Sequence, residues 1–333
     1  MQRLRIGLVG CGGIARWHAS TLLSLPDAEI VGLADPSEAN LEAMRKENPA
    51  LAQVPSFSTA EKLYEAVKPE AVEIATPHTM HYNQVVAAIG HGLHVLCEKP
   101  LACSPAEARD IAQRAESAGV TVMVSYQRRF DPAYLYMRRV IADGQLGEIR
   151  TITITCGQNW RKGTTGSWRQ DPALSGGGML MDSGSHMVDM LLWLVDQKPV
   201  AVSAIVDNLG APVELNSSTT VRFANGAQGQ LTVVGDFPTT WLENVLIVGS
   251  QGVLRLETEP QHPWRTGRVL HYRDGELVQP LKLPAGQVPD EAWLEAIRGS
   301  GPNPAPPEAG LRVAELTTAI YKSGREGQVV TIE

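Results

Sequence analysis

The strongest constraint on the fold lies near the start of the chain, where an apolar run leads into closely spaced glycines. Residues 5–9 (RIGLV) predict a short strand, and a helical stretch is predicted after the glycines, through Leu25. The turn between them, GCGGIA, follows the pattern G-x-G-x-x-A. Gly10 permits a tight turn, Gly12 lets a pyrophosphate approach the backbone, and Ala15 lets the helix pack against the strand. The sequence therefore predicts a dinucleotide site at this turn.

The start of that helix is expected to hold the phosphates of the nucleotide. Backbone N–H groups at a helix N-terminus have no partner within the helix, and the helix dipole favours an anion there. Gly13 and Ile14 contribute to this part of the predicted site.

A carboxylate after the second predicted strand indicates which nucleotide is bound. Residues 29–34 form this strand, and Asp35 follows it, about twenty residues beyond Gly12. Such a carboxylate can accept hydrogen bonds from both ribose hydroxyls and would repel a 2′-phosphate. Pro36 follows, where a chain that binds NADP often carries arginine or serine, so NAD is favoured over NADP. The alternative is that Asp35 caps a helix that begins just after it.

The alternation of strand and helix continues to about residue 125. Ser58 begins a capping-box pattern and Ser104 precedes a proline and a glutamate, which are helix-start signals. The further strands are predicted at 71–75, 94–98 and 120–125, and the helices at 58–67, 82–90 and 104–117. Apolar strands separated by helices of this length predict a parallel sheet. Together with the glycine turn they predict a Rossmann domain over residues 1–125.

Beyond residue 125 the apolar pattern changes to a period of two, which is typical of half-exposed strands. A helix is predicted at 132–142 and a last one at about 308–323. Strands are predicted at 148–156, 200–206, 219–223, 229–234, 245–248, 253–257 and 268–272. Asn-Gly and Asp-Gly pairs mark hairpins between them. Residues 126–333 are therefore expected to form an α+β domain with a mainly antiparallel open sheet, whose free face suggests a subunit interface.

Charge and cysteine usage exclude several classes of function. The chain has 29 Lys and Arg against 36 Asp and Glu, a net charge of −7, which argues against nucleic-acid or anionic-membrane partners. The four cysteines, at 11, 97, 103 and 156, form no C-x-x-C pair, so no zinc ribbon is predicted. Scattered cysteines in a chain of 333 residues indicate a reduced compartment, and no apolar stretch is long enough to cross a bilayer. We expect a cytoplasmic location.

Two groups of residues could carry chemistry. Lys99 follows a buried strand, where it could donate a hydrogen bond to a substrate oxygen; the alternative is a solvated lysine. Asp182 and His186 follow three glycines and stand four residues apart in a predicted helix over 179–194, so they would share one face, which Asp189 could extend. A carboxylate and an imidazole suit acid–base work, but could also be a structural pair. With no compelling third ligand, no metal site is predicted.

These motifs together resemble one family, the Gfo/Idh/MocA oxidoreductases. The resemblance runs through most of the chain, and EKP at 98–100 followed by GGG-x-x-x-D-x-x-x-H is its most specific part. The other matching segments are GLVGCGGIA, ADPS, ATPHTMHY, QRRFDPAY, SWRQDPALSGGGMLMDSGSH and GLRVAELTTAIYKSGREGQVV. The resemblance implies a two-domain NAD(P)-dependent enzyme that oxidises secondary hydroxyls of sugars, cyclitols or related diols.

The resemblance also implies roles for individual residues. His186 would accept the proton of the hydroxyl, Lys99 would orient that hydroxyl and lower its pKa, and Asp182 would position the substrate or the other two groups. The residues expected to line the cofactor are Thr76, Pro77, His78, His81 and Glu98, and those expected in the substrate cleft are Arg128, Trp168 and Arg169. Members of the family commonly form homodimers or homotetramers through the C-terminal sheet.

Two other functions are compatible with the same pattern. One is an NAD-sensing regulator without catalysis, which would have no need to keep Lys99 or His186. The other is a glycosidase that uses NAD for transient oxidation. A dehydrogenase accumulates NADH with a polyol, the glycosidase releases a leaving group without net NADH, and a regulator does neither.

Overall fold

The computed structural model describes residues 3–258 and 267–332, which form two compact units. The first unit extends to Tyr126 and also includes Gln287–Leu311; the second comprises Gln127–Gly286 and the chain from Arg312. The sequence predicts a domain boundary at residue 125, and the first segment of this unit ends at Tyr126. The return of Gln287–Leu311 differs from the expectation that everything after 125 belongs to the second domain. It occurs because α10 (Pro289–Ile297) packs against α1 (Gly13–Ser24) and buries Trp293 completely.

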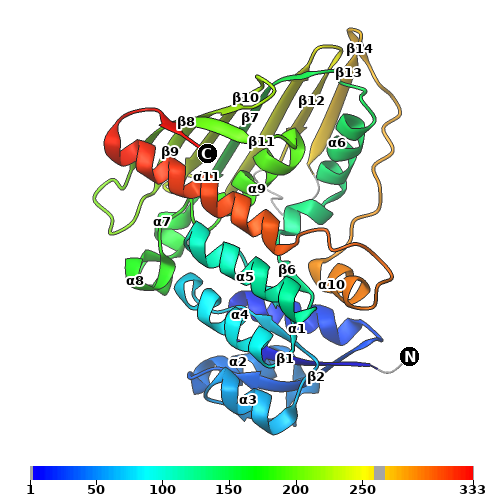
Figure 1. Cartoon of the computed structure of the whole chain (residues 1–333), viewed down its shortest axis with the longest axis vertical. Coiled ribbons are helices and arrows are strands. Elements are labelled where there is room, and N and C mark those ends of the chain that lie inside the picture. The colour runs from blue at the N-terminus through cyan, green and yellow to red at the C-terminus, as the bar shows by residue number, and fades with distance from the viewer. Residues whose placement is uncertain (1–2, 259–266, 333) are drawn as a thin grey trace. The chain divides into compact units, whose positions relative to one another are not determined.

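The first unit is built on a six-stranded parallel sheet with the order β3-β2-β1-β4-β5-β6, which Figure 1 shows in blue to cyan and green. Its strands are β1 (Leu4–Val9), β2 (Ala28–Ala34), β3 (Ser56–Phe57), β4 (Ala71–Ile74), β5 (His94–Cys97) and β6 (Val122–Val124). The order reverses between β1 and β4, and ligands of such sheets bind beyond the carboxyl ends of the strands at that point. The predicted Rossmann architecture is confirmed.

The helices of this unit begin largely where the sequence signals place them. Ser104 caps its helix by accepting a hydrogen bond from the N–H of Glu107, as predicted. Thr59 caps the helix after β3, one residue later than the predicted Ser58. Besides α1 and α10, the helices are α2 (Glu38–Glu47), α3 (Ala60–Val67), α4 (His81–Gly90) and α5 (Pro105–Ala118), with short 3-10 turns at Pro49–Leu51 and His78–Met80.

The second unit contains a nine-stranded sheet with the order β14-β13-β12-β11-β7-β10-β9-β8-β15. All neighbouring strands are antiparallel except β7 and β10, which confirms the mainly antiparallel sheet. The strands are β7 (Ile149–Gln158), β8 (Pro199–Asp207), β9 (Asn216–Phe223), β10 (Gln228–Val234), β11 (Trp241–Gly249), β12 (Gly252–Glu257), β13 (Arg268–Arg273), β14 (Glu276–Leu277) and β15 (Val330–Thr331).

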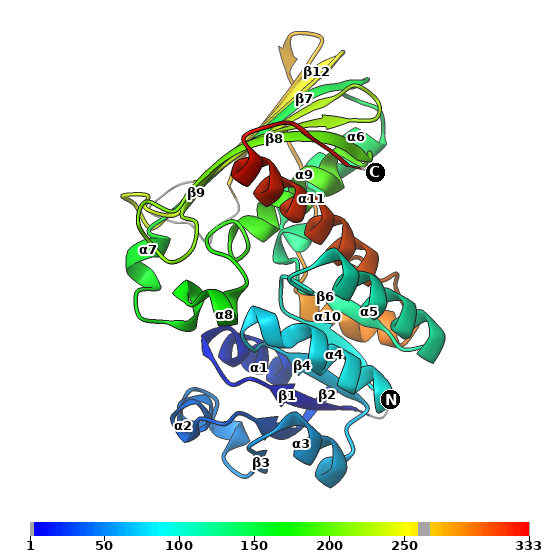
Figure 2. The same ribbon diagram turned by 60° about the vertical axis from the view of Figure 1, so that its left-hand side comes forward.

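Helices cover one face of this sheet, as Figure 2 shows for α6 (Pro132–Ala142), α9 (Gly184–Val195) and α11 (Pro307–Glu326). Along β9 and β10, buried residues alternate with exposed or half-buried ones, as expected when one face of a sheet is covered. Shorter helical segments are α7 (Trp160–Gly163), α8 (Pro172–Ser175) and the 3-10 turns Gln127–Phe130 and Trp168–Gln170. In the described parts of the chain, no helix is long and apolar enough to span a membrane.

Candidate active site

The glycine turn after β1 has the geometry of a phosphate cradle. Gly10 adopts φ +86°, and a Cβ at this position would lie 2.6 Å from the carbonyl oxygen of Ala75, so only glycine fits. Gly12 is the N-cap of α1, where no side chain caps the helix, and a Cβ added to it would meet nothing within 4 Å. Because Gly12 has no side chain, a ligand can approach the start of α1, and the pyrophosphate of a dinucleotide fits there. Gly13 and Ile14 form the first turn of α1, and Ala15 is buried behind them.

Asp35 is held directly against this turn. Its Oδ2 accepts a hydrogen bond of 2.8 Å from the N–H of Cys11, and its Oδ1 accepts one of 2.8 Å from the N–H of Ser37. The amide of Asn40 lies 3.2 and 3.3 Å from the two carboxylate oxygens. Ser37, and not Asp35, is the N-cap of α2, so the alternative interpretation of Asp35 as a helix cap is wrong. The carboxylate joins the end of β2 to the glycine turn.

The segment after β4 is tied to the segment after β5 by a buried histidine. His81 is fully buried, with Nδ1 2.7 Å from the carbonyl oxygen of Pro100 and Nε2 2.9 Å from that of Thr76. Burial, reinforced by the charge of His78, lowers the pKa of His81 to about 4, so the ring is neutral at pH 7. His78 is also buried, whereas Thr76 and Pro77 are half-buried. These residues form one packed corner at the carboxyl edge of the sheet.

Lys99 stands at the same edge, directly after β5. Its backbone N–H donates to Oε2 of Glu98 over 3.3 Å, and its peptide bond to Pro100 is cis. Glu98 in turn donates its N–H to the carbonyl oxygen of Ile74, which joins the ends of β5 and β4. Lys99 is half-buried, while Glu98 is 5% exposed. The first unit therefore brings together the predicted cofactor residues and Lys99.

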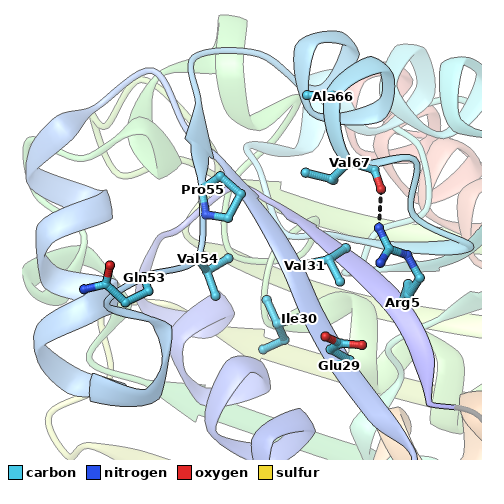
Figure 3. A pocket seen from close by; sticks show the side chains of 9 residues that line it. All are labelled: Arg5, Glu29, Ile30, Val31, Gln53, Val54, Pro55, Ala66 and Val67. Carbon is cyan, nitrogen blue, oxygen red and sulfur yellow. Dashed lines mark hydrogen bonds between the residues drawn. The ribbon is translucent and has the colours of Figure 1, made fainter.

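A groove of about 460 Å³ elsewhere in the first unit does not belong to this edge. As Figure 3 shows, it is bordered by the early parts of β1 and β2, where the Arg5 guanidinium donates to the carbonyl oxygen of Val67. Its lining residues are Arg5, Glu29, Ile30, Val31, Gln53, Val54, Pro55, Ala66 and Val67. None of the predicted site residues is among them, and the strands' carboxyl ends are where this fold binds ligands.

In the second unit, the Asp182 carboxylate binds one aromatic and one basic side chain. Its Oδ2 accepts hydrogen bonds from Nε1 of Trp160 at 2.8 Å and from Nε of Arg169 at 2.9 Å. The guanidinium of Arg169 lies 4.5 Å from the centre of the Trp168 ring. Asp182 is 4% exposed and His186 is 9% exposed. Trp160 is a member of this site that the sequence analysis missed, although it follows the end of β7.

The predicted helix over 179–194 begins later than expected, at Gly184. Asp182 therefore lies in the turn that leads into α9, where its N–H donates to the carbonyl oxygen of Gly178. Asp189 does not extend the Asp182–His186 face as suggested. Its carboxylate binds the Arg129 guanidinium at two points, with distances of 2.8 and 2.6 Å.

The three glycines before Asp182 have a packing role. A Cβ on Gly178 would lie 1.9 Å from the carbonyl oxygen of Glu214, so no larger residue fits. The Glu214 carboxylate accepts hydrogen bonds from the N–H groups of Gly178 (2.6 Å) and Leu180 (3.0 Å) and from the hydroxyl of Tyr321 (2.8 Å). Glu214, which the sequence analysis missed, thereby fixes the backbone that leads to Asp182.

Arg128 is anchored in the same unit by a buried carboxylate. Its Nε donates to both oxygens of Glu243, at 3.1 and 3.0 Å, and the guanidinium lies 5.4 Å from the Trp241 ring centre. Glu243 also accepts hydrogen bonds from the Tyr134 hydroxyl and from Nε1 of Trp241. The Arg128 side chain is 18% exposed, so part of it can still meet a ligand.

Comparisons with known proteins agree with this architecture. Residues 4–126 match the family model described as "Oxidoreductase family, NAD-binding Rossmann fold", and residues 134–255 match "GFO/IDH/MocA C-terminal domain". The chain is 30% identical to 1,5-anhydro-D-fructose reductase of Ensifer adhaerens, covering 99% of this chain and 98% of the relative. It is 29% identical to the rhizopine catabolism protein MocA of Rhizobium meliloti, covering 96% of each.

Solved structures show the same fold. The WlbA dehydrogenase from Bordetella pertussis, in complex with NADH and UDP-GlcNAcA, is 25% identical, with a TM-score of 0.86 over 100% of this chain and 99% of that chain. The structure contains two units of the predicted kinds and the glycine turn, and the relatives match over nearly their whole length. The chain belongs to the Gfo/Idh/MocA family of NAD(P)-dependent sugar and polyol oxidoreductases.

Proposed function

We propose that this enzyme transfers a hydride between NAD and a secondary alcohol or ketone of a sugar, cyclitol or related diol. The observation that carries the choice of NAD is the Asp35 carboxylate, held at the glycine turn by the N–H of Cys11. Each of its oxygens accepts one backbone hydrogen bond at 2.8 Å, and the Asn40 amide is shared between the two at the longer distances of 3.2 and 3.3 Å. The ribose hydroxyls would take the place of this Asn40 amide. A 2′-phosphate would meet the same negative charge.

The proposed chemistry assigns one task to each of three residues. His186 takes the proton from the hydroxyl that is oxidised, because an imidazole titrates near neutral pH. Lys99 donates a hydrogen bond to the same oxygen, and its positive charge stabilises the alkoxide that forms. Asp182 positions the substrate through Trp160 and Arg169, both of which donate hydrogen bonds to its carboxylate. NAD supplies the hydride acceptor when it is bound.

The charges of the second unit favour an uncharged substrate. Three arginines of this unit are each paired with a carboxylate: Arg128 with Glu243, Arg129 with Asp189, and Arg169 with Asp182. Such a pair is already neutralised, so it gains less from a carboxylate or phosphate on the substrate than an uncompensated arginine would. We therefore expect neutral polyols to be preferred to sugar acids and sugar phosphates.

The test is a substrate screen that follows NADH absorbance. Neutral cyclitols, aldoses and anhydrohexitols are compared with their uronates and phosphates, each with NAD and with NADP, and aryl glycosides are included so that release of a leaving group can be followed. The proposal predicts net NADH with a neutral polyol. Release of a leaving group without net NADH would instead establish the glycosidase alternative, and NAD binding without any turnover would establish the regulator. The homodimer or homotetramer expected for the family is tested separately, by light scattering of the purified chain.

A further inference from the structure

Four ionisable side chains meet inside the first unit, and sequence analysis anticipated only Glu98 among them. His18 of α1 is at their centre, with 0% exposure, and it faces Glu73 of β4, Glu98 after β5 and Asp290 of α10. Its Nδ1 lies 3.0 Å from both carboxylate oxygens of Asp290, and its Nε2 lies 3.2 Å from Oε1 of Glu98. Glu73 Oε1 is 3.6 Å from Nδ1. The Trp17 ring also lies beside His18, with 4.8 Å between the ring centres.

Charged carboxylates on both sides of the ring favour a proton on each nitrogen of His18. Both nitrogens face carboxylate oxygens, which accept hydrogen bonds when ionised, and a neutral imidazole has only one N–H to donate. Burial alone would lower the pKa of His18, but the nearby carboxylates outweigh burial and raise its pKa well above the ordinary value. An imidazolium between Asp290 and Glu98 satisfies both contacts.

The Glu73 carboxyl group is then protonated and uncharged. It is 1% exposed, and neither of its carboxyl oxygens has a hydrogen-bond partner in the described structure. Burial raises the pKa of Glu73 well above its ordinary value, and the neighbouring Asp290 and Glu98 act in the same direction. With Glu73 neutral, the cluster holds one cation and two anions, and Asp290 lies in the first turn of α10, where the helix dipole favours a negative charge.

The cluster reaches the proposed catalytic lysine through Glu98. One Glu98 oxygen faces His18, and the other accepts the backbone N–H of Lys99. We propose that His18 is a positioning residue, which as an imidazolium clamped by Asp290 holds the Glu98 carboxylate and thereby the turn that carries Lys99. This inference rests on the proposed function, because it gives Lys99 a reaction to be positioned for. A misplacement of about 1 Å at a catalytic group can lower turnover roughly 100-fold.

Two substitutions of His18 separate this role from a general loss of stability. The amide nitrogen of glutamine can occupy the place of Nε2 and donate to Glu98, whereas the shorter asparagine can occupy only the place of Nδ1, near Asp290. We expect His18→Gln to keep kcat within about 3-fold of wild type and His18→Asn to lower it about 10-fold or more, with both substrates saturating. His91→Asn, at an exposed histidine just after α4, is the matched control and should leave kcat unchanged.

Thermal unfolding of every variant completes the comparison. A purely structural His18 would make the two kcat values follow the two melting temperatures, and equal kcat values for the Gln and Asn variants would overturn the positioning role. Absence of turnover in the wild type would overturn the proposed function itself, together with the link to Lys99. Wild-type turnover with equal variants would overturn only the role of His18.

Two further measurements do not depend on activity. In a ¹⁵N-histidine NMR spectrum, the signal lost in His18→Gln should show protons on both ring nitrogens at pH 8, and a single protonated nitrogen would contradict the imidazolium. His18, Glu73 and Asp290 also have ligand atoms within 4.8 Å of one another, close enough to surround a metal ion. The proton network predicts no stoichiometric metal in the purified protein, and a bound metal that His18→Asn loses would overturn it.

Discussion

Replacing Asp35 by serine tests the cofactor preference most closely. In the structure the two Asp35 oxygens accept one backbone N–H each, from Cys11 and from Ser37, both at 2.8 Å. If each oxygen also accepts a ribose hydroxyl, the substitution removes two charged hydrogen bonds, worth at least about 1.5 kcal/mol each. A loss of about 3 kcal/mol weakens NAD binding by roughly 150-fold. NADP loses less, because the repulsion of its 2′-phosphate disappears.

The assay is kcat/KM with NAD and with NADP on the same polyol, and the ratio of the two should move toward NADP by about 100-fold or more. Asp35→Ser should also lower the free energy of unfolding by about 1–2 kcal/mol, because one buried backbone N–H loses its acceptor. Glu42→Ser, at an exposed position of α2, removes the same charge without touching the site and should leave the ratio as it is. An unchanged ratio in Asp35→Ser would refute the ribose role.

The remaining predictions concern the backbone cradle and the buried histidine. Gly12→Val should abolish NAD binding in calorimetry and lower the melting temperature only slightly, because its side chain enters open space and costs only a poorer N-cap. Gly10→Val should lower the melting temperature more, because its side chain meets the backbone of Ala75. Normal NAD binding by Gly12→Val would contradict the cradle. His81 has a folded pKa of about 4, below the unfolded value of about 6.5, so the unfolded state takes up its proton first as the pH falls. The free energy of unfolding should therefore decrease between pH 6.5 and 4, by up to about 3 kcal/mol, and urea titrations of His81→Gln should show a smaller decrease; equal slopes would contradict this.

Features that depend on residues close together in the sequence were predictable. The glycine turn and Asp35 belong to one strand–helix–strand unit, so their spacing alone indicates that they meet, and the contact between Asp35 and Cys11 agrees. Helix α6 has the predicted bounds of 132–142, because Asp131 and Pro132 are strong start signals. The sheet of the second unit was likewise predictable from its period of two.

Contacts between distant residues were not predictable. His18 and Asp290 are 272 positions apart, and no local sequence pattern indicates that Gln287–Leu311 returns to the first unit. Glu73 was a missed signal, since a charged residue inside a buried apolar strand needs a partner or a proton. The start of α9 was placed too early because apolar spacing continues through the turn, while the contact between Gly178 and Glu214 that shapes this turn comes from tertiary packing.

The most direct test of the account is isotope transfer from the substrate carbon to the nicotinamide. A neutral polyol that is active in the screen is prepared with deuterium on its carbinol carbons and incubated with NAD and the wild-type chain, and the reduced nucleotide is analysed by mass spectrometry. Direct hydride transfer gives one deuterium per NADH formed, and Lys99→Ala should lose about 1000-fold or more in rate with NAD affinity largely intact. Unlabelled NADH, or full activity in Lys99→Ala, would contradict the proposed hydride transfer and the place of Lys99 in it.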